Sequence, residues 1–187
     1  MALSIEEQIK GLADTISSAQ LHFDVWRALE VSRNDPKNVE VLNTYFEFFY
    51  ASIPANFESC LVSCYQLLET KDDRISFPSL RRELLGKEGL DVGSVPQLVD
   101  LEKAMKPTWK RINTLRNNQI GHLSKQNTPA QVYAQAGLND SLMEEFISRA
   151  KELHRGITQI RNRSIDAFNV RGSASVEKLL AVLRGQL

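Results

Sequence analysis

The sequence lacks any apolar run close to the roughly 20 residues that a membrane-spanning helix needs. Its first residues, MALSIEEQIKGLADTI, also lack a cationic start followed by an uninterrupted apolar stretch, which a signal peptide would have. We therefore expect no membrane partner and a location in the cytoplasm. The formal net charge is zero, so total charge gives no reason to expect a nucleic acid or an acidic partner.

Glycine and proline are scarce, at 9 and 6 of 187 residues. Together with a hydrophobic share of 42% and a charged share of 25%, this composition excludes a disordered chain and is ordinary for a globular protein. A chain of this length can bury one hydrophobic core and is short for two. We predict a single domain over residues 1–187.

Cysteine is nearly absent, since the chain has only Cys60 and Cys64. Their spacing places both on one face of an expected helix, where a disulfide between them would strain the backbone. No histidine lies near enough in the sequence to suggest a zinc site. We interpret both thiols as small hydrophobic core residues, and we expect neither a metal nor another cofactor.

What the sequence does contain is helical periodicity in segment after segment. Apolar residues from Ile5 to Leu29 recur three, four or seven positions apart, as one face of a helix requires. No convincing strand, hairpin turn or internal repeat is found, so the sequence predicts an all-α helical bundle. Further helices are predicted over about residues 39–51, 52–68, 76–85, 95–121, 141–168 and 173–183.

Local signals predict how several of these helices begin or break. Ser76 is placed to cap a short helix, and Pro54 suits the first turn of a helix that starts near Ser52. Pro107 falls inside a long helix, where we expect a kink or a break. The segment QNTPAQVYAQAGLND is predicted to be a connection between helices.

Positive charge is concentrated in the C-terminal half of the chain. No aspartate or glutamate occurs from Lys103 to Asn139. Two interpretations stay open: a solvated helix face balanced by acidic neighbours such as Glu58, Asp72 and Asp73, or a footprint for a phosphate backbone. The cationic residues concerned are Lys103, Lys106, Lys110, Arg111, Arg116, Lys125, Arg149, Lys151, Arg155, Arg161 and Arg163.

The most unusual segment is RNNQIGH, Arg116 to His122, at the end of the predicted long helix. At about 100° per residue, Arg116 and Gln119 point along the core-facing stripe that Ile112 marks, and His122 lies near the opposite edge of that stripe from Arg116. A buried guanidinium without a partner costs several kcal/mol. Three receivers are possible for Arg116: a carboxylate of the same chain, a second subunit, or a bound anion.

Each of these polar residues also has a purely structural interpretation. His122 can bind the last carbonyls of the helix, Arg116 can form a salt bridge within the chain, and the two asparagines can bond to the helix end. Outside the segment, Trp109 is expected to pack on the core and His22 to be structural. We place His154 at the surface or at the edge of the core.

RNNQIGH resembles the Arg-Asn-x-x-x-Ala/Gly-His signature of the HEPN superfamily, whose members are small helical bundles that often act as metal-independent ribonucleases. The arginine, the asparagine after it and the histidine all match, and five residues separate Arg116 from His122, within the family's usual four to six. The preceding segment, Tyr65 to Leu84, is similar to its counterpart in the abortive-infection branch of that superfamily. The resemblance covers roughly residues 57–124.

The resemblance implies a dimer in which both copies of the motif line one RNA-binding cleft. His122 would take or return a proton, Arg116 would hold phosphate oxygens, and Asn117 would orient the phosphate or the imidazole. The expected product carries a 2′,3′-cyclic phosphate. The residues expected to bind RNA around this site are Lys110, Arg111, Asn118 and Lys125.

The same resemblance fits a toxin or phage-defence effector, with an antitoxin or another defence-system protein as a further partner. The alternative is a non-catalytic HEPN-like module that binds a nucleotide, RNA or a protein. A metal-dependent nuclease is disfavoured because no cluster of carboxylates or histidines accompanies the motif. A helix-turn-helix DNA reader is disfavoured too, since no short helix pair with a tight turn is found.

Overall fold

The computed structural model describes residues 3–71, 73–121, 129–162 and 168–186. In these residues it forms eight α-helices and no strand, which confirms the predicted all-α class. The helices are α1 (Ile5–Ser32), α2 (Val39–Thr44), α3 (Phe46–Leu67), α4 (Phe77–Glu88), α5 (Pro96–Leu115), α6 (Pro129–Ala136), α7 (Asp140–Ile160) and α8 (Gly172–Arg184). Shorter helical segments are η1 (Pro36–Asn38), η2 (Val92–Ser94) and η3 (Arg116–Gly121). Within the described residues, no helix is long and apolar enough to cross a bilayer.

The helix starts use side-chain caps. Ser4 and Glu7 form a reciprocal capping box at the start of α1. The predicted cap at Ser76 is confirmed, because its hydroxyl accepts a hydrogen bond from the Ser79 N–H at 3.2 Å. Asn139 caps α7 in the same way through the Leu142 N–H at 2.9 Å. These caps fix where the chain enters three of the helices.

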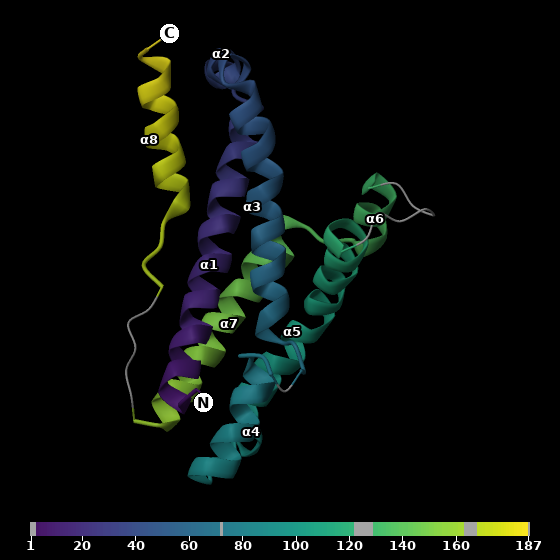
Figure 1. Ribbon diagram of the computed structural model, residues 1–187, viewed down its shortest axis with the longest axis vertical. Coiled ribbons are helices and arrows are strands. Elements are labelled where there is room, and N and C mark those ends of the chain that lie inside the picture. The colour runs from purple at the N-terminus through teal and green to yellow at the C-terminus, as the bar shows by residue number, and fades with distance from the viewer. Residues whose placement is uncertain (1–2, 72, 122–128, 163–167, 187) are drawn as a thin grey trace.

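Two long helices, α1 and α3, run side by side through the centre of the molecule (Figure 1). α7 packs on α1 and on α5, while α8 lies along the other side of α1. The main core is formed where α1, α3, α4, α5 and α7 meet, and a second, smaller cluster joins the end of α1 to α2, α3 and α8. Cys60 and Cys64 are free and buried in the main core, which confirms their interpretation as core residues. Their mutual contact and their burial raise the pKa of the Cys64 thiol.

The boundary between the second and third predicted helices was misplaced. The break lies at Tyr45, whose φ of −110° and ψ of 39° leave the helical region, and α3 then continues through Pro54. Pro107 likewise lies inside an unbroken α5, so a break there is wrong. Each proline leaves the carbonyl four residues earlier without a donor, and those residues, Tyr50 and Lys103, are exposed. Water can bond to these carbonyls, and the helices continue.

Two boundaries in the second half also differ from prediction. The segment expected to be a connection contains α6, whose Val132 and Ala136 are buried on one face. α6 stops at Gly137, which has a positive φ of 56°. The last long helix, predicted to reach residue 168, ends at Ile160, and Asn162 takes a left-handed φ of 53°. Asparagine tolerates this conformation better than most residues, and it ends the helix without a glycine or a proline.

Candidate functional site

The motif segment does not continue α5 as an α-helix. Arg116–Gly121 forms the π-helix η3, with wider turns than the 100° wheel assumes. The expectation of a regular helix to Gly121 is therefore wrong, and the directions inferred from it for Gln119 and His122 no longer follow. His122 and Lys125 lie outside the described residues. π-helical turns occur frequently at functional sites, so this segment is the leading site candidate.

Arg116 packs on an aromatic ring. Its guanidinium carbon lies 4.2 Å from the centroid of the Tyr65 ring, and the side chain is half-buried. A cation at this distance is attracted to the negative face of the ring. Among the described residues, no carboxylate forms an ion pair with Arg116. Tyr65, a residue of α3, is therefore a partner of Arg116 that the sequence did not indicate.

Tyr65 is itself held by α5. Its ring stacks on Trp109 with centroids 5.5 Å apart and planes 14° apart, and the Trp109 Nε1–H donates to the Tyr65 carbonyl at 2.8 Å. The Tyr65 hydroxyl donates to Glu69 at 3.4 Å. Burial, followed by the Glu69 charge, raises the pKa of Tyr65, while the Arg116 charge opposes this rise. Trp109 packs against the main core as predicted, and Tyr65 is a contact of Arg116 that the motif alone did not indicate.

Asn117 joins Arg116 in a short polar chain. The Arg116 Nη1 donates to Asn117 Oδ1 at 3.1 Å, and Asn117 Nδ2 donates to Asn113 Oδ1 at 3.1 Å. Asn117 and Asn118 are both exposed. Two of the three expected catalytic residues, Arg116 and Asn117, are therefore adjacent and in contact.

The two cations on α5 that we expected to bind RNA have different surroundings. Arg111 donates to the carbonyls of Ala136 at 3.1 Å and Gly137 at 2.6 Å, so it ties α5 to the end of α6. A cation suits this position because the last carbonyls of a helix carry partial negative charge. Lys110 is exposed on α5.

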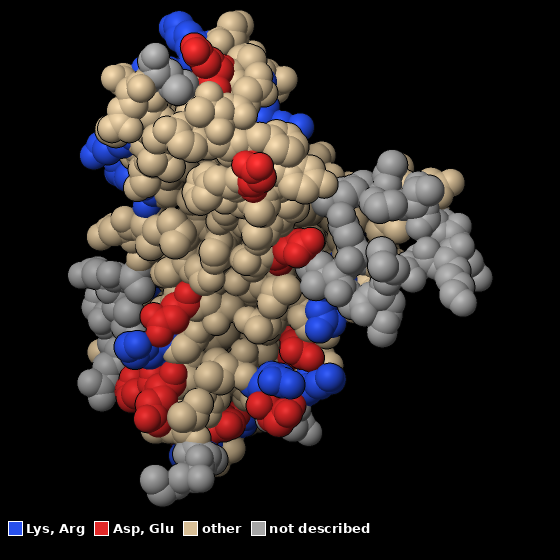
Figure 2. Space-filling view, turned by 45° about the horizontal axis from the view of Figure 1, so that its top comes forward, with Lys and Arg blue, Asp and Glu red and all other residues tan. Residues whose placement is uncertain are grey.

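Several other cations of the C-terminal half form ion pairs with acidic side chains. Lys106 pairs with Glu102 at 3.5 Å and Arg149 with Glu145 at 2.6 Å. Figure 2 shows blue and red side chains interspersed around a broad uncharged area on the face drawn. These pairs favour the solvated interpretation for this charge, although the balancing residues differ from the three suggested by the sequence.

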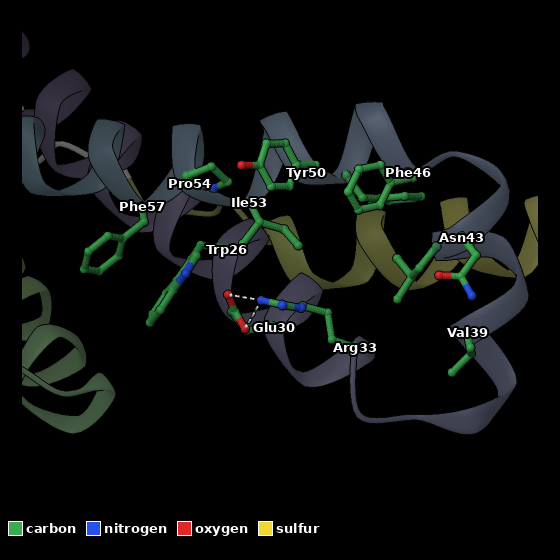
Figure 3. Close-up of a pocket in the computed structure, with 12 residues that line it drawn as sticks. Trp26, Glu30, Arg33, Val39, Asn43, Phe46, Tyr50, Ile53, Pro54 and Phe57 are labelled. Carbon is green, nitrogen blue, oxygen red and sulfur yellow. Dashed lines mark hydrogen bonds and ion pairs between the residues drawn. The ribbon is translucent and has the colours of Figure 1, made fainter. Parts of the chain in front are cut away.

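An apolar trough lies away from the motif, between α1, α2 and the first half of α3 (Figure 3). Its cavity of about 710 Å³ is lined by aromatic side chains that include Trp26, Phe46 and Tyr50. Phe46 and Tyr50 are 56% and 71% exposed. At one edge the Arg33 Nη1 lies 3.1 Å from Glu30 Oε1. The trough involves no residue of η3.

The two described histidines are structural. His22 contacts Asn56 Oδ1 through Nδ1 at 2.8 Å, linking α1 to α3 as expected. His154 is 1% exposed, which corrects its placement at the surface or core edge, and its Nε2 lies 3.1 Å from the Ile9 carbonyl. Burial lowers the pKa of His154. In the described parts of the chain, no group of three or more His, Cys, Asp or Glu residues could hold a metal ion.

The chain is similar to a known protein family. The family model HEPN_AbiU2, described as AbiU2, matches residues 3–178. The matched range contains Tyr65, Trp109 and the whole of η3. No curated protein and no solved structure matches the chain.

Proposed function

The chain belongs to the AbiU2 family of HEPN-type, abortive-infection-associated domains, and on that premise we propose that it is a metal-independent RNA endonuclease. The proposed substrate is RNA, and the proposed active unit is a homodimer with one motif from each chain along a shared cleft. This activity suits a toxin or phage-defence effector. An antitoxin or another defence-system protein is then a further partner.

The observation that carries the proposal is the environment of Arg116. Its guanidinium lies against the neutral Tyr65 ring and bonds to the neutral Asn117 side chain, and within the described chain no carboxylate neutralises it. Arginine stays charged at every physiological pH and can hold two phosphate oxygens at once. A fixed cation of this kind can stabilise the charge that develops on a phosphate during cleavage.

The proposed reaction needs only RNA and side chains. His122 removes the proton of a 2′-OH, and that oxygen attacks the adjacent phosphorus. The bond from phosphorus to the 5′-oxygen of the next nucleotide breaks, and this oxygen takes up a proton. The products are a 2′,3′-cyclic phosphate and a 5′-hydroxyl. Arg116 and Asn117 hold the phosphate oxygens during the exchange.

The test is incubation of the purified protein with a mixed RNA pool in EDTA, followed by analysis of the fragment ends. We expect wild type to cleave and to leave 2′,3′-cyclic phosphates. His122→Ala should lower the rate by at least about a hundredfold, as loss of a general base does. Arg116→Ala should lower it by a similar factor, since it removes transition-state stabilisation.

Lys178→Ala is the matched control, because Lys178 is an exposed cation on α8. This helix packs on α1 and α2, whereas η3 packs on α3, α5 and α6. It should cleave like wild type. The alternative function is a non-catalytic HEPN-like module that binds a nucleotide, RNA or a protein. Absence of cleavage by folded, dimeric wild type would refute the nuclease and favour that module.

A further inference from the structure

We infer that Tyr65 is a positioning residue for Arg116, with Trp109 supporting the Tyr65 ring from the other side. Tyr65 belongs to α3, 51 positions before Arg116, and lies outside the RNNQIGH motif. Its proposed role is to fix the guanidinium at the start of η3 without neutralising it. The catalytic consequence of this role rests on the proposed ribonuclease function.

The spacing of the three side chains supports this arrangement. Trp109 and Arg116 are seven positions apart, so they lie on one face of the helix and about 10.5 Å apart along its axis. The Tyr65 centroid is 5.5 Å from that of Trp109 and 4.2 Å from the Arg116 guanidinium carbon. The two distances together nearly match the axial separation. The Tyr65 ring therefore contacts two side chains that lie two turns apart on one face of the helix.

Tyr65 is held by its backbone carbonyl and its hydroxyl as well as by the face of its ring. Trp109 Nε1–H donates to the Tyr65 carbonyl at 2.8 Å, and that carbonyl, in the last turn of α3, also accepts from the Leu68 N–H at 3.4 Å. The Tyr65 hydroxyl bonds to Glu69 at 3.4 Å. Backbone, ring and hydroxyl are thus each held. A ring fixed in this way gives the guanidinium a defined surface.

Packing on a ring has a different chemical consequence from pairing with a carboxylate. Arginine has several rotatable bonds, so an unsupported guanidinium loses entropy when it binds a phosphate. Tyr65 restricts the side chain beforehand, as substrate-positioning groups do in enzymes. Because the ring is neutral, Arg116 keeps its full charge for an incoming phosphate. An acidic partner would compete with that phosphate for the same N–H donors.

The kinetic test compares Tyr65→Leu, which removes the π face, with Tyr65→Phe, which keeps the face and removes only the hydroxyl. We expect Tyr65→Leu to lower kcat for RNA cleavage about tenfold and to change KM less than about twofold, given the usual strength of a half-buried cation–π contact. Tyr65→Phe should stay within about twofold of wild type. Tyr50→Leu is the control, since Tyr50 is an exposed tyrosine elsewhere on α3. Thermal unfolding of each variant measures its folded fraction.

A second measurement tests the placement of Arg116 without any need for activity. The Arg116 Nε–H resonance, identified by its loss in Arg116→Lys, should be shifted upfield by the ring current in wild type and in Tyr65→Phe. It should return to an ordinary position in Tyr65→Leu. If wild type does not cleave RNA, the proposed function fails, and this resonance still decides whether Tyr65 positions Arg116.

Three results would overturn the inference. One is a folded Tyr65→Leu that cleaves like wild type. Another is an equal loss of kcat in Tyr65→Phe and Tyr65→Leu, which would assign the effect to the hydroxyl and Glu69. The third is an Arg116 resonance that does not change when the ring is removed. Loss of kcat in Tyr65→Leu with rescue in Tyr65→Phe, together with the shifted resonance, supports it.

Discussion

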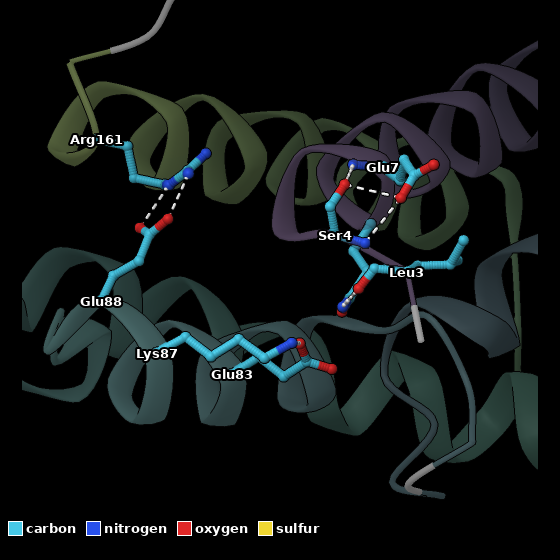
Figure 4. Close-up of polar contacts among 8 residues, drawn as sticks. Leu3, Ser4, Glu7, Glu83, Lys87, Glu88 and Arg161 are labelled. Carbon is cyan, nitrogen blue, oxygen red and sulfur yellow. Dashed lines mark hydrogen bonds and ion pairs between the residues drawn. The ribbon is translucent and has the colours of Figure 1, made fainter. Parts of the chain in front are cut away.

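Arg161 gives the most specific stability prediction, because its side chain joins three helices at one end of the molecule. Its side chain is 9% exposed, and the residue is the C-cap of α7. Its Nε and Nη2 donate to both oxygens of Glu88 in α4, at 2.9 and 2.6 Å (Figure 4). Its Nη1 lies 3.1 Å from Glu6 Oε1 in α1, as an ion pair without hydrogen-bond geometry. A two-pronged bond of this kind is stronger than a single contact.

The magnitude follows from the exposure of the partners. Exposed pairs contribute about 0–1 kcal/mol, whereas removing one partner of a fully buried pair costs about 3–5 kcal/mol. The Glu88 side chain is 31% exposed, so water can solvate it when Arg161 is removed. We therefore expect a coupling free energy of about 1–2 kcal/mol between Arg161 and Glu88. Glu88→Gln should cost more than Arg161→Met, because the buried guanidinium then faces a neutral amide in place of the carboxylate.

The assay is a double-mutant cycle by urea unfolding at pH 7, with wild type, Arg161→Met, Glu88→Gln and the double variant. The cycle is needed because Glu88 lies near the C-terminal end of α4, where a negative charge is unfavourable and its removal stabilises. Lys10 and Asp14 in α1 form the control pair, at 2.9 Å but 76% and 67% exposed. Its coupling should be only a few tenths of a kcal/mol. Equal coupling in the two cycles would refute the argument from burial.

Three other substitutions test the packing. Burial lowers the pKa of His154 in the folded state, so the unfolded state binds a proton more readily. The free energy of unfolding should be highest above about pH 6.5 and should fall as the pH drops from there through the lower pKa of the folded state. The total loss is about 1.4 kcal/mol for each unit by which the two pKa values differ. His154→Leu should remove this dependence, measured by urea unfolding at pH 7 and pH 5. Gly156→Ala would place its new methyl against Leu98 Cδ2, and the overlap should outweigh the helix gain, with a net loss of about 1 kcal/mol. The same change made in a Leu98→Ala background, itself less stable than wild type, should cause no further loss. Ser76→Ala should cost about 1 kcal/mol in thermal unfolding, because the Ser79 N–H loses its cap; Ser4→Ala at the exposed start of α1 should cost less.

The sequence predicted the helices whose signals are local. Ser76 followed by Pro78 predicted the start of α4, and apolar spacing predicted α1, because both depend on residues within a few turns. The break at Tyr45 has no glycine or proline to mark it. Whether a proline breaks a helix depends on what its unpaired carbonyl faces, as Pro54 and Pro107 show. That information lies in the tertiary structure.

The candidate site shows the same difference between local and long-range signals. Arg116 and Asn117 were found because they are adjacent in a recognisable motif, and the structure places them in contact. Tyr65 was missed because its link to Arg116 joins two helices 51 positions apart, and no spacing rule relates them. Arg116 is half-buried and packs on the Tyr65 ring, whereas the sequence suggested only a carboxylate, a second subunit or a bound anion as its partner.

The π-helical hydrogen-bond pattern of η3 has a consequence for insertions and deletions in this region. A π turn contains one residue more than an α turn, so a single deletion within Arg116–Gly121 can be absorbed by a change to the α pattern. The same deletion within α5 would rotate every later side chain by about 100° and remove it from its neighbours. The chain can therefore shorten by one residue just after Arg116 while Trp109 and Tyr65 keep their contacts. A motif with a variable number of residues between its arginine and its histidine is compatible with such a turn.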